Sequence, residues 1–471
     1  MGYPARGLGA VAAGLCALWL PGSPPQAQAG KRPNVLIITT DQQRVDAMSA
    51  AGNRWARTPH MDSIAAQGVY FTRSYCPYPL CSPSRASLHT SRMPHEILVD
   101  HNSLPIAPDV PVSGQVFRAA GYDTGYAGKW HLPEAYPTDG IAGYEVLNKT
   151  SRKGKLARDV DEATMTAAIE FIRRERDKPF LLTVSFINPH DICLLAGEDS
   201  PLLKDVWEKY QPAEGAELPP IPPNFAETEG RPEGLARRRL HEQWDENQWR
   251  RYRHAYGRMV EDVDRQVGQV MEALRRAGKE EDTVVVFTSD HGEGLGSHRW
   301  TGKMMFYEEE AAVPLVVSWK GVTPAGRVDR EHLVSALDVL PTICDYAGVP
   351  PPPVVRGRSL RPVIEKPDQA GAEFVVSEMA PGGAAAGGRS FMVRTGKYKY
   401  MAFPGAGGGR LEMLFDMESD PGEMKNLAGE AGLAAELERH RRLLAEWNRT
   451  TGEDQRPVKP NPEASRRRKG R

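Results

Sequence analysis

Cysteine and long apolar runs are both scarce in this chain. Its 471 residues include five cysteines, and past the first thirty residues no apolar stretch is long enough to span a bilayer. The four cysteines of the remaining chain make no disulfide framework and lack the paired spacing of a zinc site. The sequence therefore excludes a small disulfide-built domain, a structural zinc module and a membrane-spanning protein.

An excess of charge is missing as well. The formal net charge is −1, so no overall field draws the protein to nucleic acid or to an anionic membrane. Only the last residues, 466–471, are strongly basic. Such a run is typical of a solvated chain end, with a contact to polyanions as the alternative. We expect no nucleic-acid partner.

The first thirty residues have the pattern of a targeting segment. Arg6 supplies a positive charge, residues 8–20 form a short apolar stretch, and Ala-Gln-Ala at 27–29 offers a cleavage site with small residues. We predict a signal peptide at 1–29 and a mature chain that begins near Gly30; the alternative is a disordered tail or a membrane anchor. This pattern predicts export to the periplasm or the extracellular space.

Apolar runs alternate with helical patterns along the first two thirds of the chain. Uninterrupted, β-branched runs predict buried strands at residues 34–40, 180–186, 283–289 and 313–319. Helical patterns occupy residues 59–67 behind Thr58 as a cap, 113–120, 159–176 and about 245–276. This alternation predicts an α/β fold whose large domain has a mostly parallel sheet sandwiched by helices.

The pattern changes past residue 365. Short strands are predicted at residues 374–377, 391–394, 398–401 and 411–416, joined by glycine-rich loops at 382–388 and 405–409 and followed by a helix at 433–447. They indicate a smaller C-terminal antiparallel sheet with a helix. We predict a catalytic domain at 30–365, a C-terminal subdomain at 366–450 and a basic flexible tail at 451–471. Residues 194–243, rich in proline and charge, predict a long loop, either a substrate wall or a tolerated insertion.

Polar side chains follow three of the predicted strands. Asp41 and Gln42 end the first, residues 188–190 (Asn-Pro-His) end another, and Asp290 and His291 end a third. Ligands of such sheets bind beyond the carboxyl ends of the strands. Carboxylate and amide oxygens with one imidazole suit a single divalent cation. We predict a metal site at Asp41, Gln42, Asp290 and His291; the alternative for each pair is a turn that ends a strand.

The sharpest local pattern is Cys-Ser-Pro-Ser-Arg at residues 81–85. Ser84 is predicted to cap a helix that begins just after the cysteine, which leaves Cys81 at the positive end of that helix. Arg85 adds a cation, and this setting favours an anionic nucleophile and an anionic substrate. The alternative is a buried cysteine before an ordinary helix.

This string, Cys-x-Pro-Ser-Arg, resembles the recognition motif of the sulfatase family within the alkaline phosphatase superfamily. The resemblance runs from about residue 32 to 427. Four more segments match in order: Gly-Lys-Trp-His at 128–131, Asn-Pro-His-Asp at 188–191, His-Arg-Trp-Thr-Gly-Lys at 298–303 and a closing signature at 414–427. Ser91 replaces a glycine of the family pattern, outside the core motif.

The metal residues depart from the common family pattern. Asp41 and Gln42 stand where many members have two aspartates, and His291 stands where members have asparagine or histidine. The combination resembles the branch that contains choline sulfatases and phosphonate monoester hydrolases. The resemblance implies calcium, with manganese and magnesium as alternatives.

The resemblance also implies a modified nucleophile. A maturation enzyme would convert Cys81 to formylglycine, and the hydrated aldehyde, with one hydroxyl on the metal, would attack sulfur. By the same resemblance Lys129 and Lys303 bind the sulfate oxygens, and Arg85 steadies the hydrated aldehyde. His190 or Lys303 protonates the leaving oxygen, and His131 removes the proton of the second hydroxyl, so that the aldehyde re-forms and sulfate leaves.

The predicted function is hydrolysis of sulfate monoesters, which we expect to belong to a sulfated carbohydrate. A polar sugar needs hydrogen-bonding partners, and four residues are candidates: Asp100, His101, Asn102 and Asp191. One alternative is a phosphonate or phosphate ester hydrolase on the same scaffold, since a phosphoryl group has a similar shape. A second is a non-catalytic protein that binds sulfated glycans.

Overall fold

The structure is a computed structural model that describes residues 32–132, 140–148, 155–196, 202–227, 243–380, 388–405 and 409–452. The predicted signal peptide at 1–29 lies outside these residues. So do nearly all of the predicted tail at 451–471 and parts of the loops predicted at 194–243, 382–388 and 405–409. Within the described ranges, no helix combines the length and the apolar character needed to cross a bilayer.

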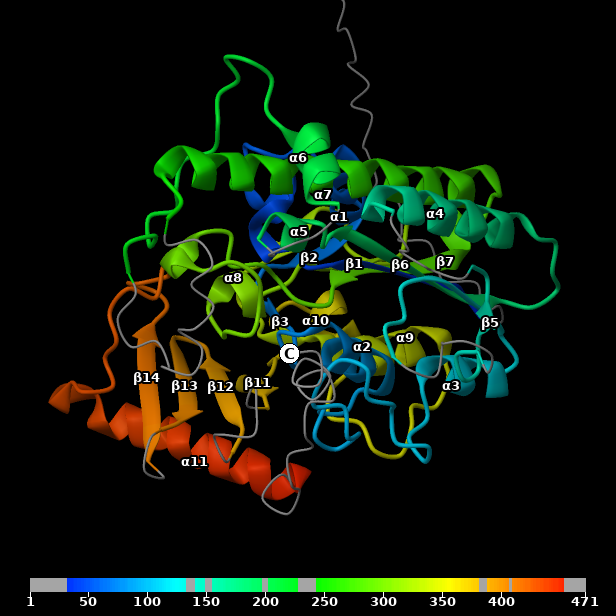
Figure 1. The fold of residues 1–471 in the computed structure, drawn as a ribbon. Helices are drawn as coiled ribbons and strands as arrows, with labels where there is room; N and C mark the ends of the chain where they lie inside the picture. Colours follow the sequence, from blue (N-terminus) through cyan, green and yellow to red (C-terminus); the bar gives the residue numbers. More distant parts are fainter. Residues whose placement is uncertain are drawn as a thin grey trace, which may run out of the picture. The chain divides into compact units, whose positions relative to one another are not determined.

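The described part of the catalytic region is built around one large sheet (Figure 1). Its strand order is β5-β4-β6-β1-β7-β8-β2-β9. The strands are β1 (Asn34–Asp41), β2 (Gly68–Phe71), β4 (Asp123–Gly128), β5 (Glu145–Val146), β6 (Phe180–Pro189), β7 (Thr283–Ser289), β8 (Leu315–Ser318) and β9 (Arg327–Asp329). Neighbouring strands are parallel except at β8, which is antiparallel to both β7 and β2. The predicted mostly parallel sheet is confirmed.

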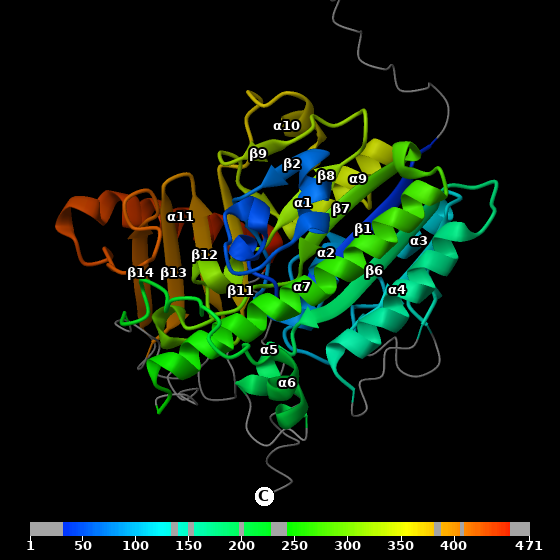
Figure 2. The ribbon, with the colours of Figure 1, turned by 90° about the horizontal axis from the view of Figure 1, so that it is seen from above.

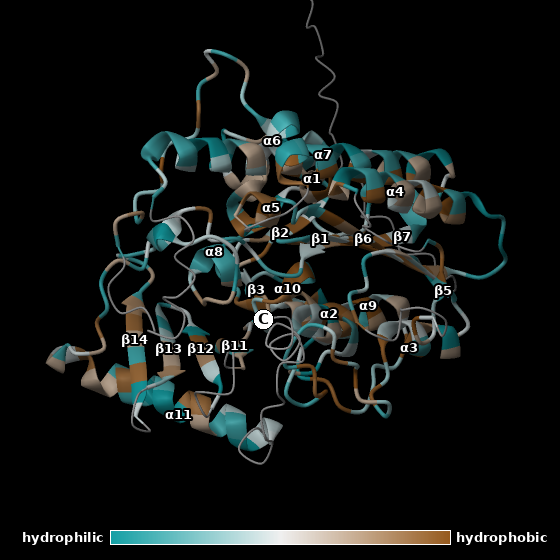
Figure 3. Cartoon of the chain, viewed as in Figure 1, coloured by the Kyte–Doolittle hydropathy of each residue, from teal (hydrophilic) through white to brown (hydrophobic). Residues whose placement is uncertain are grey.

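Helices cover both faces of this sheet (Figures 1 and 2). One face carries α1 (Pro59–Ala66), α4 (Ala157–Arg173) and α7 (Glu246–Arg276); the other carries α2 (Cys81–Thr90), α3 (Ser113–Ala119), α9 (Val339–Ala347) and α10 (Arg361–Glu365). Alternate residues of β1 enter the two cores: Ile38 belongs to the core that includes Val267 of α7, and Ile37 to the core that includes Ile343 of α9. Each fully buried aliphatic side chain of this kind contributes about 1.5–3 kcal/mol. Figure 3 shows the apolar strands between helices whose outer surfaces are polar.

The C-terminal sheet is antiparallel and follows chain order. Its strands are β11 (Phe374–Met379), β12 (Ser390–Thr395), β13 (Tyr398–Pro404) and β14 (Arg410–Asp416), and α11 (Ala434–Thr451) packs on it. On one face, Val393 and Leu414 contact the core formed with Leu444 of α11. On the other, Met392 and Met401 belong to a second core shared with residues 304–307. The predicted small antiparallel sheet with a helix is confirmed.

The segment predicted as one long loop contains helical structure. It begins within α5 (Ile192–Leu195) and includes α6 (Leu203–Tyr210). Val206 and Tyr210, four residues apart, are buried against the face of α7 that carries Tyr252. The loop prediction is wrong at these residues. The prolines and charged residues around them made the apolar spacing of a short amphipathic helix difficult to recognise in the sequence.

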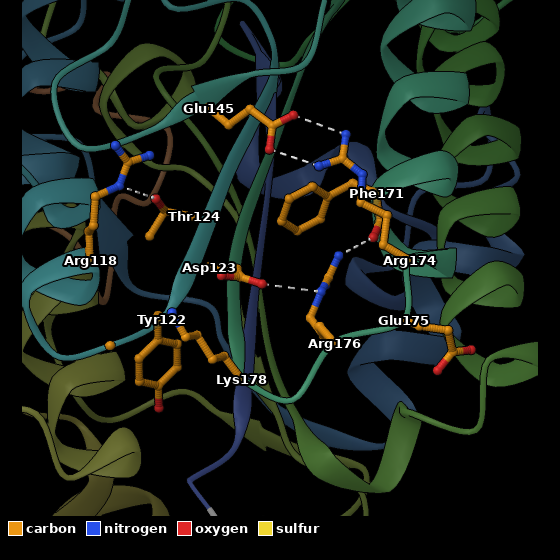
Figure 4. Close-up of a pocket in the computed structure, with 11 residues that line it drawn as sticks. Arg118, Tyr122, Asp123, Thr124, Glu145, Phe171, Arg174, Glu175, Arg176 and Lys178 are labelled. Atoms are coloured by element: carbon orange, nitrogen blue, oxygen red, sulfur yellow. Dashed lines mark hydrogen bonds and ion pairs between the residues drawn. The ribbon is translucent and has the colours of Figure 1, made fainter.

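A cavity of about 410 Å³ opens where β4 begins. Four of the ionic groups that line it form pairs: Arg174 binds Glu145 at 2.8 and 3.0 Å, and Arg176 lies 3.7 Å from Asp123 (Figure 4). Asp123 is the first residue of its strand, so this cavity lies at the amino ends of the parallel strands. The polar residues singled out by the sequence lie at the opposite, carboxyl ends.

Candidate active site

The catalytic candidates converge at the carboxyl ends of the central strands. Asp41 ends β1, His190 and His291 follow β6 and β7, Lys129 follows β4, and α2 supplies Cys81 and Arg85. Ligand atoms of four buried residues lie within 4.8 Å of one another: Asp41, Cys81, Asp290 and His291. The predicted convergence of these strands on one site is therefore present.

Cys81 is the first residue of α2, and Leu80 occupies the N-cap position without a side-chain cap. The prediction that Ser84 caps this helix is wrong. Because the helix begins at the cysteine itself, Ser84 lies within its first turns, and its hydroxyl donates to the carbonyl of Asp290 at 2.5 Å. Cys81 still lies at the positive end of the helix, as the sequence predicted.

The thiol of Cys81 is enclosed by polar groups. Its Sγ lies 3.0 Å from Nζ of Lys303 and 3.2 Å from Nε2 of His291. Burial and the carboxylate of Asp41 raise the pKa of the thiol, but Lys129 and Lys303 outweigh them and hold this pKa well below its ordinary value. Position 81 is thus built to carry an anionic group.

Arg85 links the carboxylates of two neighbouring strands. Its Nη2 donates to Asp41 at 2.8 Å and its Nε to Asp290 at 2.9 Å, and its side chain is 2 % exposed. Burial and the nearby Asp41 raise the pKa of Asp290. Burial also raises the pKa of Asp41, but Lys129 leads the positive groups that hold it well below its ordinary value. Two buried carboxylates placed this close favour a cation between them.

The amide oxygen of Gln42 points toward Lys303, the residue that also contacts Cys81. Its Nε2 donates to the carboxylate of Glu293, while Oε1 accepts from Nζ of Lys303 at 3.1 Å. The residue has a φ of 71°, in the left-handed region that residues other than glycine rarely adopt. The oxygen of Gln42 therefore shares Lys303 with Cys81, which fits the predicted ligand role.

Lys129, His190 and His131 are the remaining catalytic candidates. Nζ of Lys129 donates to Asp41 at 2.6 Å, and Nε2 of His190 lies 3.9 Å from Asp41. Burial, with a further contribution from Lys129, lowers the pKa of His190 to about 3 and lowers that of His131 as well. The side chains of Lys129 and His190 are 11 % and 20 % exposed, whereas that of Asp41 is fully buried. Solvent thus reaches the site on the side of Lys129 and His190.

The four candidate substrate residues are engaged by the protein. Asp100 forms a buried ion pair with Arg389, and Asp191 accepts the backbone N–H of Ala157 at 2.6 Å. Asn102 accepts the N–H of Ser82 in the first turn of α2 at 3.0 Å, and His101 is buried. The contact with Ser82 places Asn102 beside Cys81.

Three residues that contact Gln42 or its neighbour Glu293 were not predicted from the sequence. Glu293 and Cys193 both touch the amide of Gln42, and Tyr252 of α7 donates to Glu293 at 2.8 Å. The position of Glu293, two residues after His291, was an available signal. For Tyr252 the chain offered none, since only the folded helix brings it to the site.

Comparisons with known proteins agree with this geometry. The family model described as "Sulfatase" matches residues 33–349, and that described as "N-sulphoglucosamine sulphohydrolase, C-terminal" matches residues 296–449. A Delta 4,5-hexuronate-2-O-sulfatase of Bacteroides thetaiotaomicron is 32% identical over 454 residues, covering 92% of this chain and 92% of its own.

Solved structures agree on the fold. A structure described as a 2-O GAG sulfatase has a TM-score of 0.78 and 29% identity, covering 92% of this chain and 96% of its own. A phosphonate monoester hydrolase of Agrobacterium radiobacter has a TM-score of 0.75 at 23% identity, covering 89% of this chain and 96% of its own, a likeness of fold alone. Because the first family model spans more than half of the chain, the protein belongs to the sulfatase family of the alkaline phosphatase superfamily and is a hydrolase of sulfate esters.

Proposed function

We propose that this sulfatase removes a sulfate group from a sulfated carbohydrate, with formylglycine at position 81 as nucleophile and one divalent cation at the site. The carbohydrate assignment is supported by the relatives, since one is named a Delta 4,5-hexuronate-2-O-sulfatase and another an N-acetylglucosamine-6-O-sulfatase. The nucleophile assignment is supported by one observation above all. Sγ of Cys81 lies at a helix N-terminus within 3.2 Å of both Lys303 and His291.

The residues present fit a divalent cation. Asp41, Asp290 and His291 bring two carboxylates and an imidazole into one buried cluster, and Gln42 adds an amide oxygen. Oxygen-rich donor sets of this kind suit calcium, and the imidazole also suits manganese. When bound, the cation would lower the pKa of a hydroxyl on residue 81 and withdraw charge from the sulfate. Arg85 would hold the two carboxylates in place through its contacts with both.

Formylglycine would supply a hydroxyl where the structure has the thiol of Cys81. Lys303 lies within hydrogen-bonding distance of this atom, and Lys129 lies on the solvent-facing side of Asp41. The two ammonium groups would bind the sulfate oxygens as charge builds on them. Lys303 would donate a proton to the departing alcohol, or His190 would do so once the anionic sulfate bound beside it has raised its lowered pKa. His131 would accept the proton of the second hydroxyl of residue 81, so that its carbonyl re-forms and sulfate leaves.

A substrate panel tests this function. It would contain an unsaturated 2-O-sulfated hexuronate disaccharide, glucosamine sulfates, nitrophenyl sulfate and a phosphonate monoester, each incubated with the mature protein. We expect fastest sulfate release from a glycan. Faster cleavage of the phosphonate would favour the phosphonate hydrolase alternative, and binding of glycans without turnover by converted protein would favour the non-catalytic one.

We also propose that the chain is exported. The support is the charged, apolar and small-residue pattern of residues 1–29. Sequencing the N-terminus of the protein recovered from its native compartment would test this, with a start near Gly30 expected. A start at Met1 on exported protein would contradict cleavage.

A further inference from the structure

The amide of Gln42 is held in one orientation by a carboxylate behind it. Nε2 donates to Oε2 of Glu293, and the sulfur of Cys193 lies 3.1 Å from Nε2 and 3.2 Å from Oε1. Turning the amide over would set its oxygen against the Glu293 carboxylate, an acceptor against an acceptor. Glu293 thus keeps the oxygen of Gln42 directed toward Lys303 and Cys81.

Glu293 is itself fixed by several donors. Its Oε1 accepts from the hydroxyl of Tyr252 at 2.8 Å, from the N–H of Gly302 at 2.6 Å and from the N–H of Leu295 at 3.2 Å. The residue is fully buried. With Gln42, these groups make four donors to one carboxylate, which cannot rotate without losing them.

The backbone of Gln42 is anchored as firmly as its side chain. Its N–H donates to Oδ1 of Asp290 at 3.0 Å, and its carbonyl accepts from the hydroxyl of Tyr256 at 2.9 Å. These contacts hold the left-handed φ of 71°. The amide oxygen of Gln42 is therefore held in a fixed position, as a candidate metal ligand, beside the buried carboxylates.

We propose that Glu293, supported by Tyr252, is a positioning residue that makes Gln42 a metal ligand and places beside it the negative charge that an amide lacks. This inference rests on the divalent-cation site of the proposed function. A buried aspartate at position 42 would bring that charge to the cation directly. Here the charge lies on Glu293, behind Gln42, and acts through the Gln42 amide. Partners of this kind change metal affinity by about 10–100-fold when they are removed.

A double-mutant cycle tests the proposal on the mature full chain stripped of metal. Dissociation constants for Ca²⁺ and Mn²⁺ would be measured by competition with a fluorescent chelator for wild type, Glu293→Gln, Gln42→Asp and the double variant. Glu293→Gln should weaken binding by about 10–100-fold. In the double variant the negative charge lies on residue 42 and residue 293 is neutral, and affinity should return close to that of wild type. Gln42→Asp alone sets two carboxylates together and should tighten binding less than it does in the Glu293→Gln background.

A second pair of variants keeps the test valid if Glu293→Gln fails to fold. Tyr252→Phe removes one donor to Glu293 and should weaken cation binding measurably. Tyr122→Phe is the matched control, because its hydroxyl donates to the carbonyl of Pro33 at 3.0 Å, at the amino ends of the strands; it should leave affinity unchanged. Unfolding temperatures of the metal-free proteins would verify the fold.

Three results would overturn the proposal. Wild-type affinity in both Glu293→Gln and Tyr252→Phe would remove the positioning role while leaving the metal centre intact. A double variant that binds the cation no more tightly than Glu293→Gln would exclude the role proposed for the negative charge of Glu293. Failure of wild type itself to bind either cation would overturn the metal centre of the proposed function, and this inference with it.

Discussion

The ammonium group of Lys303 lies 3.0 Å from the sulfur of Cys81. The same Nζ is 3.1 Å from the amide oxygen of Gln42 and 3.3 Å from Nε2 of His291. One flexible cation thus touches the nucleophile position and two of the proposed metal ligands. Under the proposed mechanism, this relationship places Lys303 within reach of the sulfate that residue 81 attacks.

Replacing Lys303 by alanine should lower kcat by about 10²–10³-fold, the usual cost of removing one preorganised donor from a site of charge development. The measurement is kcat on the best substrate of the panel. Lys320→Ala, which removes a lysine that pairs with Glu280 at the surface, is the control and should keep wild-type kcat. A Lys303→Ala enzyme with undiminished kcat would exclude Lys303 from the chemistry.

The two histidines should affect different halves of the reaction. His190→Ala should slow sugar sulfates far more than nitrophenyl sulfate, because a nitrophenolate departs without a proton and a sugar alkoxide does not. Rates over a series of leaving groups give the measurement. If Lys303 is the acid, the steep dependence should appear in Lys303→Ala and be absent from His190→Ala.

His131→Ala should slow all substrates toward one common rate, since release of sulfate from residue 81 no longer depends on the alcohol that left. Mass spectrometry should then detect sulfate bound to the peptide that contains residue 81. Equal losses on good and poor leaving groups in both histidine variants, with no bound sulfate, would refute this division of roles.

Removal of the divalent cation should abolish activity, and addition of Ca²⁺ or Mn²⁺ should restore it. Asp290→Asn should act like chelation, because it removes one of the two carboxylates that the described residues bring to this site, where the third oxygen ligand is the neutral Gln42. The readouts are sulfate release and bound metal per protein. Full activity after exhaustive metal removal would contradict the assignment of Asp41, Gln42, Asp290 and His291.

A buried charge network makes a separate prediction for stability. Lys399 of β13 is fully buried and lies 2.9 Å from both Glu308 and Glu423. Lys399→Met should cost about 3–5 kcal/mol of unfolding free energy, because it leaves the buried carboxylate of Glu423, and the partly exposed one of Glu308, without this cation. Urea unfolding measures it. Lys397→Met removes a nearby lysine whose side chain is 45% exposed and should cost less than about 1 kcal/mol; equal losses would contradict the argument.

The sequence predicts the central strands well and the edge of the sheet poorly. The sequence segments that form β1, β6 and β7 are long, apolar and rich in β-branched residues. Each strand therefore begins and ends within a few residues of the predicted bounds. By contrast β2 (Gly68–Phe71) is four residues long and β4 contains glycines, so neither gives a clear pattern. The reversed direction of β8 depends on its neighbours, which no local pattern records.

The same distinction holds within the site. Asp41, His190 and Asp290 could be predicted because they directly follow recognisable strands. The bridge that Arg85 makes between Asp41 and Asp290, and the contact of Gln42 with Glu293, join residues up to 251 positions apart. Such contacts depend on side-chain directions at the ends of different strands, and only the folded chain fixes them.

Sulfate release by the wild type and by Cys81→Ala tests the role of the nucleophile most directly. Both proteins would be expressed with a formylglycine-generating activity, and mass spectrometry of the peptide containing residue 81 would verify conversion of the wild type. Cys81 contacts polar groups, so the variant should fold with a similar unfolding temperature. We predict turnover of a sulfated glycan by converted wild type and none by Cys81→Ala or by unconverted protein. Substantial sulfate release by either of these two would contradict the role assigned to residue 81.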